Sequence, residues 1–185
     1  MNSDLVVVVS DREEVERLWR AGAFGSSTRT TYFKPRFIDN NNPGSAVEES
    51  LQLNLMEARH LGIVVAAEPA SPAPVSTTWR LDPNHLCRTY SKLRKAGWVV
   101  KNGSQFGSDF VLYAKSPELC HSSYCVTVVP SQGDDRPLPL GAMFRQMRAA
   151  EQTRKRFVLC DESSNECVAL KRWVVRQEEP RRKQW

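Results

Sequence analysis

The amino-acid sequence predicts an α/β (α+β) protein with a small N-terminal α/β domain and a C-terminal domain whose mixed sheet is flanked by helices. Two observations lead to this prediction. Hydrophobic residues alternate between helix-like and strand-like periods along the chain, and a stretch with three prolines interrupts the pattern at residues 68–78. We therefore predict an N-terminal domain over residues 1–75, a linker at about 68–78, and a second domain over residues 79–185.

The N-terminal part reads as a strand, two helices and an intervening loop. The apolar run at residues 5–9 predicts a strand, and a helix follows it with Ser10 or Asp11 as N-cap and ends before Gly22. Its apolar face consists of Val15, Leu18 and Trp19. Residues 25–45 have the composition of a loop, and residues 50–67 predict a second amphipathic helix with Leu51, Leu55, Ala58 and Leu61 on one face.

The C-terminal part begins with a helix at residues 84–95, which follows Asp82-Pro83, ends at Gly97 and buries Leu86, Tyr90 and Leu93. The predicted strands lie at residues 98–101, 110–113, 124–129, 156–160 and 168–175, with a further helix at 140–153. Asn102-Gly103 is a turn signal between the first two strands. An acidic connection at residues 161–166 separates the last two.

Charge is distributed unevenly along the chain. Residues 1–75 contain 7 Lys and Arg against 10 Asp and Glu, whereas residues 76–185 contain 19 against 11. The basic part is where a polyanion would bind. The alternative is that its Lys and Arg residues only keep the surface solvated.

Composition excludes several other classes of protein. The chain has 185 residues, of which 41% are hydrophobic and 25% charged, which is typical of a globular protein. Its longest apolar runs, at residues 5–9 and 63–67, are far shorter than the roughly 20 residues of a membrane helix, so we expect a soluble intracellular protein without a membrane partner. Its five cysteines form no CxxC pair, so we expect buried or half-buried thiols and neither a disulfide framework nor a zinc ribbon.

Three sequence blocks of the C-terminal part belong together. They are KAGWVVKNGSQFGSDFVLY at residues 95–113, HSSYCV at 121–126 and RKRFVLC at 154–160. Their order, spacing and local sequences closely resemble the catalytic domain of the tRNA-splicing endonuclease family over residues 84–175. LQLNLMEA at 51–58 is similar to the end of the family's N-terminal domain. AGAFG at 21–25 and LKRWV at 170–174 resemble the larger of the two catalytic subunit types of the eukaryotic enzyme.

The resemblance implies a catalytic trio of Tyr113, His121 and Lys155, with neither a metal nor another cofactor. The implied substrate is precursor tRNA, whose introns are excised at bulge-helix-bulge-like sites to leave 2′,3′-cyclic phosphate and 5′-hydroxyl ends, formally a lyase reaction. Attack by a 2′-hydroxyl needs a group that accepts its proton, an acid for the leaving 5′-oxygen and a cation near phosphorus. With an unperturbed pKa near 6.5, a histidine suits the acid role.

Taken singly, each of these residues has a simpler interpretation. Tyr113 ends an apolar strand and would be a half-buried sheet residue. A lone histidine is usually structural, and we expect His60 and His85 to be so. Lys155 lies in the cationic run at residues 154–156, which would normally be a solvated surface. The combined pattern favours the catalytic interpretation.

The resemblance also implies that Arg148 and Trp173 bind RNA by holding a flipped bulge base between them, at the active site of a different catalytic subunit. Both a guanidinium and an indole stack on nucleobases, with about 1 to 3 kcal/mol per stacked base. The alternative makes Arg148 a helix-surface cation and Trp173 a core or interface aromatic.

Two rival functions remain. Metal-dependent nucleases usually place an acidic residue two positions before a lysine, but no Asp or Glu of this chain has Lys at that position, the strand end reads Tyr113-Ala-Lys115, and Asp109 has no clustered carboxylate. The second rival is a non-catalytic structural subunit of the same complex. Such subunits carry an acidic loop that inserts into a neighbour, at a place corresponding to residues 161–166 here. A merely solvated loop is the alternative.

The assembly stays open at this point. The chain is as compact as an archaeal protomer, so it forms a homodimer or homotetramer or else joins other endonuclease subunits. We expect the strand Val168–Val175 to pair with or pack against its counterpart in another subunit. The location would be the nucleus in a eukaryote and the cytoplasm in an archaeon.

Overall fold

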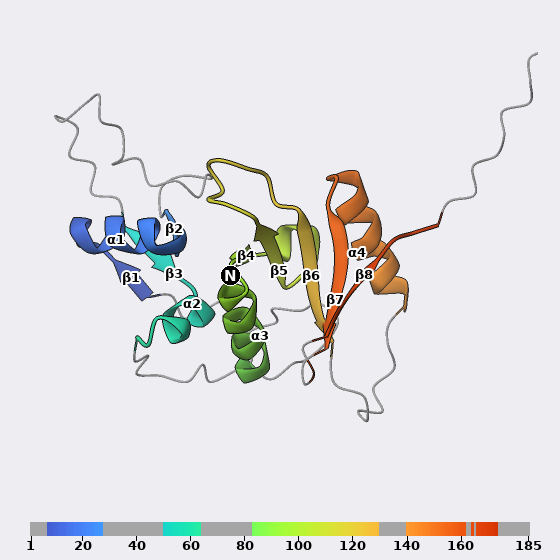
Figure 1. The fold of residues 1–185 in the computed structure, drawn as a ribbon, viewed down its shortest axis with the longest axis horizontal. Coiled ribbons are helices and arrows are strands. Elements are labelled where there is room, and N and C mark those ends of the chain that lie inside the picture. Colours follow the sequence, from blue (N-terminus) through green and yellow to red (C-terminus); the bar gives the residue numbers. More distant parts are fainter. Residues whose placement is uncertain are drawn as a thin grey trace, which may run out of the picture.

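The computed structural model describes residues 7–27, 50–63, 83–129, 140–161, 164 and 166–173. These residues form a three-stranded sheet in the order β1-β3-β2 and a five-stranded sheet in the order β4-β5-β6-β7-β8, together with four α-helices that pack on them (Figure 1). The predicted α+β class is confirmed. The linker predicted at residues 68–78 lies outside the described residues, so the domain boundary stays a prediction.

The smaller sheet is antiparallel and is covered by α1. It consists of β1 (Val7–Val9), β2 (Ser26–Ser27) and β3 (Leu51–Leu53), and α1 spans Arg12–Gly22. The side chain of Asp11 caps α1 by accepting from the backbone N–H of Glu14. The predicted apolar face of this helix is confirmed, because Val15, Leu18 and Trp19 are buried.

The helix predicted over residues 50–67 is wrong in its first turn, where β3 lies instead. Leu51 and Leu53 are buried and Gln52 between them is exposed, which is strand alternation. Asn54 then starts α2 (Leu55–His60) with a capping box, in which its side chain and that of Glu57 bond to each other's backbone N–H. Ser26–Ser27, predicted as loop, pairs with β3 as well.

The larger sheet carries one helix on each face. Its strands are β4 (Val99–Asn102), β5 (Phe110–Tyr113), β6 (Tyr124–Val129), β7 (Arg156–Asp161) and β8 (Cys167–Leu170), and its helices are α3 (Pro83–Lys95) and α4 (Leu140–Gln152). Phe110 and Leu112 pack with α3, whereas Val111 packs with α4. β6 and β7 are parallel, and the other neighbouring strands are antiparallel. Among these described helices, none is long and apolar enough to cross a membrane.

Two predicted details of this sheet are wrong. β4 and β5 are joined by residues 103–109 with a short 3-10 helix (Ser104–Phe106), a longer connection than the two-residue turn that Asn102-Gly103 predicts. Gly103 is needed there for another reason, because a Cβ would lie 2.8 Å from the backbone of Phe110. The last strand ends at Leu170, while residues 174–175 of the predicted strand lie outside the described part.

A buried ion pair joins the two sheets. Lys101 of β4 and Glu57 of α2 are only 4% and 3% exposed, and Lys101 Nζ lies 3.4 Å from Glu57 Oε1. The ammonium also donates to the carbonyl of Gly25, whose own N–H donates to Glu57 Oε1 at 3.0 Å. Burial lowers the pKa of Lys101, and the Glu57 carboxylate opposes this shift. The N-terminal residues are thus anchored to the larger sheet by charge as well as by apolar packing.

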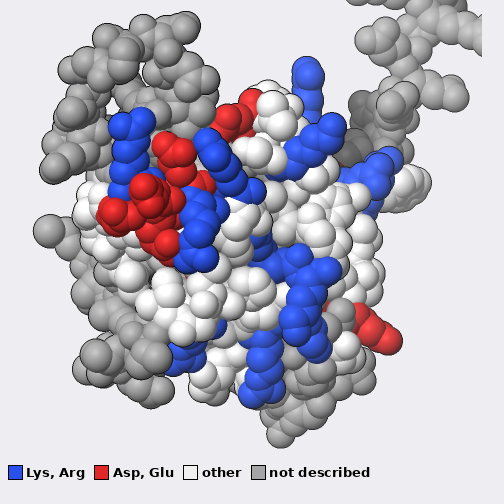
Figure 2. Space-filling model, turned by 60° about the vertical axis from the view of Figure 1, so that its left-hand side comes forward, with Lys and Arg blue, Asp and Glu red and all other residues white. Residues whose placement is uncertain are grey.

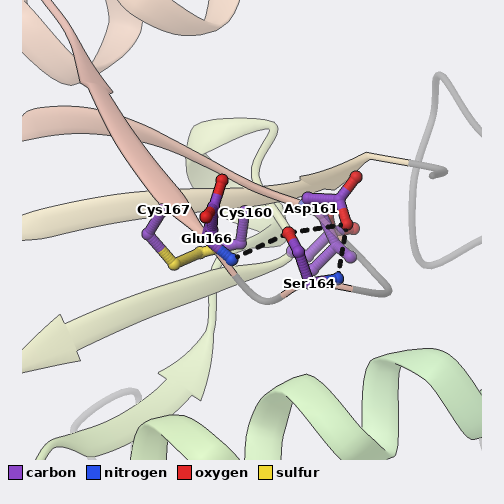
Figure 3. The surroundings of a disulfide bond; sticks show 7 residues. Cys160, Asp161, Ser164, Glu166 and Cys167 are labelled. Carbon is purple, nitrogen blue, oxygen red and sulfur yellow. Dashed lines mark hydrogen bonds between the residues drawn. A yellow bond between two sulfur atoms is a disulfide. The ribbon is translucent and has the colours of Figure 1, made fainter. Parts of the chain in front are cut away.

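The prediction that the cysteines are all thiols is wrong for two of them. Cys160 and Cys167 form a disulfide between β7 and β8, with their Cα atoms 4.2 Å apart (Figure 3). Beyond it, the N–H and the hydroxyl of Ser164 both donate to Asp161 Oδ1, at 2.7 and 3.0 Å. Antiparallel pairing of β7 with β8, which places Cys160 opposite Cys167, brings the two sulfurs together. The other three cysteines form no disulfide in the structure, and each is buried or half-buried as expected.

Candidate active site

The three predicted catalytic residues lie at the same end of the larger sheet. Tyr113 is the last residue of β5, His121 precedes β6 by three positions, and Lys155 directly precedes β7. β5 is antiparallel to β6, and β6 is parallel to β7. The end of β5 therefore adjoins the beginnings of β6 and β7, and the topology gathers the trio at one end of the sheet (Figure 1).

Backbone hydrogen bonds hold the segment that carries His121. The N–H of Ser123 donates to the carbonyl of Leu112 at 2.8 Å, and the carbonyl of Ser123 accepts from the N–H of Arg156 at 2.9 Å. The segment is thus fixed between β5 and β7 although it belongs to neither. The His121 side chain is exposed, where it can reach a substrate from solvent.

Tyr113 is buried, with 7% of its surface exposed, and its hydroxyl is hydrogen-bonded to the side chain of Ser122. Burial raises the pKa of Tyr113 above its ordinary value of 10, and the neighbouring thiols of Cys120 and Cys125 act in the same direction. The hydrogen bond from Ser122 lowers it. A phenol in this setting ionises, and so becomes able to act as a base, only when further positive charge approaches it.

Lys155 is positioned by the end of α4. Arg154 adopts a left-handed conformation (φ 57°), and the N–H groups of Arg154 and Lys155 bond back to the carbonyls of Glu151 and Ala150, at 3.0 and 2.8 Å. This is a Schellman cap with arginine where glycine is usual, so the turn carries strain of the kind found at functional sites. Lys155 Nζ lies 4.6 Å from the centroid of the Phe106 ring.

The charge of Lys155 acts on this end of the sheet. It lowers the pKa of the buried Cys125 thiol, against a larger rise caused by burial. Cys125 lies opposite Val111 of β5, two residues before Tyr113. A buried phenol, an exposed imidazole and an ammonium thus converge at a sheet end that also carries the exposed cation Arg156. This combination suits a reaction at a phosphodiester.

Comparison with known proteins identifies the family. The family model for the tRNA intron endonuclease catalytic C-terminal domain matches residues 84–170. A tRNA-splicing endonuclease of Hyperthermus butylicus is 32% identical over 165 residues, which cover 84% of this chain and 84% of the relative. The chain belongs to the tRNA-splicing endonuclease family. The family predicted from the sequence blocks is therefore confirmed, and membership supports tRNA intron cleavage as the general activity.

Other members of the tRNA-splicing endonuclease family match over different lengths. The enzyme of Sulfolobus acidocaldarius is 23% identical over 162 residues, covering 83% of both chains. The tRNA-splicing endonuclease subunit Sen2-1 of Arabidopsis thaliana is 47% identical, but over 51 residues that cover 28% of this chain and only 22% of the plant protein. The matches to the Hyperthermus butylicus and Sulfolobus acidocaldarius enzymes thus extend over most of the chain, and that to the plant subunit is local and stronger.

The predicted RNA-binding pair of this family member lies on exposed surface. Arg148 is exposed on α4, one helical turn before Glu151, which forms an ion pair with Arg172 at 3.1 Å. That ion pair holds the chain segment of Trp173 against the same side of α4. Trp173 is 85% exposed and is therefore not a core aromatic of this chain. The exposed ring is available for a contact with RNA or with another subunit.

His60 and Asp109 have structural surroundings apart from the trio. His60 is structural as expected, since its ring lies between Phe24 and Tyr90 at centroid distances of 5.9 and 5.6 Å. Asp109 is 2% exposed and accepts from the Val128 N–H at 2.7 Å. Burial raises the pKa of Asp109 to about 7. It lies at the beginning of β5, away from the trio.

Ser122 is the residue of the site that the sequence did not reveal. It is 8% exposed and bonded to the Tyr113 hydroxyl. The only signal was its place directly after His121 in the HSSYCV block, where a small hydroxyl side chain stands between the expected acid and the strand.

Proposed function

We propose that this chain is a catalytic subunit of a tRNA-splicing endonuclease that excises introns from precursor tRNA without a metal. The observation that carries the proposal is the convergence of Tyr113, His121 and Lys155 at one sheet end, within the region matched by the family's catalytic domain. A non-catalytic structural subunit would not need these three side chains at that place.

The proposed reaction is attack of a 2′-hydroxyl on the adjacent phosphodiester at a bulge-helix-bulge-like site. The ionised Tyr113 phenolate accepts the 2′-hydroxyl proton and becomes the neutral phenol, the P–O2′ bond forms and the P–O5′ bond breaks. His121 donates a proton to the departing 5′-oxygen, and the Lys155 ammonium stabilises the negative charge that develops on the phosphorane. The products are a 2′,3′-cyclic phosphate and a 5′-hydroxyl, which makes the enzyme formally a lyase.

The test is cleavage of precursor tRNA in excess chelator, followed by analysis of the new ends. We expect full activity and cyclic phosphate termini. The matched control is a metal-dependent ribonuclease, which the same chelator must silence. Strict dependence on added magnesium, or 3′-hydroxyl products, would exclude the proposed mechanism.

We further propose self-association, supported by the length of the match to the archaeal relatives. The chain would be a compact, archaeal-like form of the larger eukaryotic catalytic subunit type, acting as a homodimer or homotetramer, with other endonuclease subunits as the alternative. β8 is the edge strand of its sheet and exposes Val168 (58%). Light scattering should give at least a dimer, and a stable, active monomer at micromolar concentration would refute this. The location would be the nucleus in a eukaryote or the cytoplasm in an archaeon.

The acidic connection would contribute to the same assembly. Neutralising Asp161 and Glu162 together is expected to weaken the higher assembly more than the folding of the protomer. The comparison is between the mass from light scattering and the urea midpoint of the same variant. An unchanged mass with a lowered midpoint would leave the loop only a role in folding.

The RNA-binding role of Arg148 and Trp173 is proposed to act in trans, at the active site of a second subunit. The Arg148→Ala and His121→Ala proteins, each inactive alone, would be mixed and reassembled. Mixed assemblies should recover cleavage at one of the two splice sites, because one site then has an intact trio and an intact stacking pair. If no mixture recovers activity although assembly is confirmed, the trans role is wrong.

A further inference from the structure

The exposed face of α3 carries three cations without acidic neighbours on the helix. Arg88, Lys92 and Lys95 are exposed and follow the spacing i, i+4, i+7, which places them in one row along the helix. The sequence of α3, PNHLCRTYSKLRK, contains no Asp or Glu. Within the described part of the chain, none of the three side chains forms an ion pair. We call this row the α3 basic face.

The helix α1 shows that an exposed row of cations on this protein can be neutralised. Arg12 and Arg20 both pair with Glu16, at 3.6 and 3.1 Å, and Arg17 pairs with Glu14. Figure 2 shows this kind of arrangement, with acidic side chains gathered among basic ones in one area, while basic side chains elsewhere on the same face have few acidic neighbours. The positive charge of the α3 basic face is not cancelled in this way.

The α3 basic face ends at the same sheet end as the candidate active site, on the face of the sheet opposite Tyr113. After α3 the chain passes through Trp98 into β4, whose first residue, Val99, lies opposite Tyr113. The Trp98 ring contacts the ring of Tyr124 edge-on at a centroid distance of 5.4 Å. Tyr124 begins β6 three residues after His121. The end of α3 with Lys95 is thus at the same sheet end as the trio, and Arg88 is about 10 Å further along the helix axis.

The positive potential of this region acts on a neighbouring group. The pKa of His60 on α2 is lowered first by burial and then by the charges of Arg94 and Lys95. Arg94 is itself occupied, since its guanidinium lies 4.0 Å from the centroid of Phe24 and donates to the Gly22 carbonyl at 2.9 Å. The three cations of the α3 basic face have no such partner among the described residues.

We propose that the α3 basic face binds backbone phosphates of the RNA strand that leads away from the cleaved bond. Choosing precursor tRNA as this RNA rests on the proposed function. A row of uncompensated cations about 10 Å long that begins at the same end of the sheet as the trio fits the successive phosphates of one strand, and gains affinity by releasing counterions. Such contacts position the RNA without reading its sequence.

The experiment compares two triple variants with the same change in net charge. R88Q/K92Q/K95Q removes the α3 basic face, and R12Q/R17Q/R20Q removes the three paired arginines of α1. Both are made in the full chain with His121→Ala, so that precursor tRNA stays uncut, and binding is measured from 50 to 300 mM salt. The α3 variant should bind roughly tenfold more weakly or worse. The slope of log affinity against log salt should fall by about 2 to 3. The α1 variant should stay within about twofold.

Equal losses in the two variants would mean that only net charge matters, and no loss in the α3 variant would mean that RNA does not touch this face. An altered oligomeric mass of the α3 variant with normal RNA binding would assign the face to a protein partner. Each of these outcomes overturns the proposal. The same α3 and α1 comparison is also made with His121 intact. If the α3 variant binds more weakly than the α1 variant as expected, but the protein with intact His121 does not cleave precursor tRNA, the proposed function is wrong and the α3 contact stands. If the protein with intact His121 cleaves normally but the α3 and α1 variants bind RNA equally well, only the α3 contact is wrong.

Discussion

The two ends of the five-stranded sheet differ in exposure and in bonding. At one end, where the chain enters β6 and β7, His121 is exposed and Lys155 is held by a strained helix cap. At the other end, where these strands finish, Cys160 is in a disulfide and Asp109 is buried against the N–H of Val128. Because β6 and β7 are parallel, both strands begin at the first end and finish at the second. Substitutions at the first end should therefore change the reaction, and those at the second should change stability.

The largest expected effect tests the reactive end. His121→Ala should slow precursor tRNA cleavage by roughly 100-fold or more, because loss of an acid–base group typically costs 10² to 10⁴ in rate. Single-turnover kinetics measure the loss. The urea midpoint should not move, because the side chain is exposed. A variant with full activity, or one that only unfolds, would contradict the assignment of this end to catalysis.

Asp109 tests the opposite end through pH. Its folded-state pKa, raised to about 7, means that the folded protein holds a proton which the unfolded chain releases near pH 4. Between about pH 4 and 7 the native state binds more protons, so stability falls as pH rises across this window. Relative to Asp109→Asn, the wild type should lose roughly 2 to 4 kcal/mol of unfolding free energy from pH 4 to 8.

Urea unfolding at pH 4, 6 and 8 measures this difference. Asp109→Asn keeps an acceptor oxygen for Val128 and should be the more stable protein at pH 8, with the rate of tRNA cleavage per folded molecule unchanged. If the unfolding free energies of the two proteins change in parallel with pH, Asp109 is ionised throughout this range and takes up no proton on folding.

The disulfide offers a third comparison. Cys160→Ser with Cys167→Ser should lower the unfolding free energy by about 2 to 3 kcal/mol, the value expected for so short a closed loop. A reducing agent should lower the stability of the wild type by the same amount and leave the double variant unaffected. Cleavage per folded molecule should stay unchanged. A loss of cleavage without a loss of stability would show that the disulfide end of the sheet affects the reaction, and would contradict the assignment of the two ends to different effects.

The smallest effect concerns Ser122 and refines the reactive end. Because its hydrogen bond lowers the pKa of Tyr113, Ser122→Ala should raise that pKa further. Less of the base is then ionised at neutral pH, so the rate should fall roughly tenfold for each unit of increase, and the alkaline rise of the rate should move to higher pH. Ser123→Ala, with an exposed side chain, is the matched control. An unmoved pH profile would reduce Ser122 to a structural role.

The sequence predicted helices and strands well where the hydrophobic residues follow either a helical or a strand period clearly. The bounds of β5 and β6 agree with the structure, and Asp11, one of the two N-caps predicted for α1, is the cap. Leu51 was misassigned because two leucines around a polar residue fit a strand as well as the first turn of a helix, and only pairing with β1 and β2 decides between them. The disulfide and the contact of Ser122 with Tyr113 also depend on segments that are distant in sequence.

The catalytic role of the candidate residues stays a prediction, and their arrangement could not be predicted from the sequence. The matched blocks name Tyr113, His121 and Lys155, while their gathering at one end depends on the parallel pairing of β6 and β7, which no local pattern specifies. That the cations of α1 are paired with acidic residues and those of α3 are not could be predicted in part, since α3 has no acidic residue in its own sequence. That the end of α3 lies at the sheet end of the trio follows only from the structure, through the contact of Trp98 with Tyr124.

The buried pair of Lys101 and Glu57 limits how such chains can be recombined. A chimera that took residues 50–63 from a relative with an uncharged residue at position 57 would leave the Lys101 ammonium buried without its counter-charge. Breaking such a pair from one side typically costs 3 to 5 kcal/mol, a large part of the stability of a small protein. The two positions must therefore be exchanged together. Relatives that have lost one of these charges are expected to have lost the other as well.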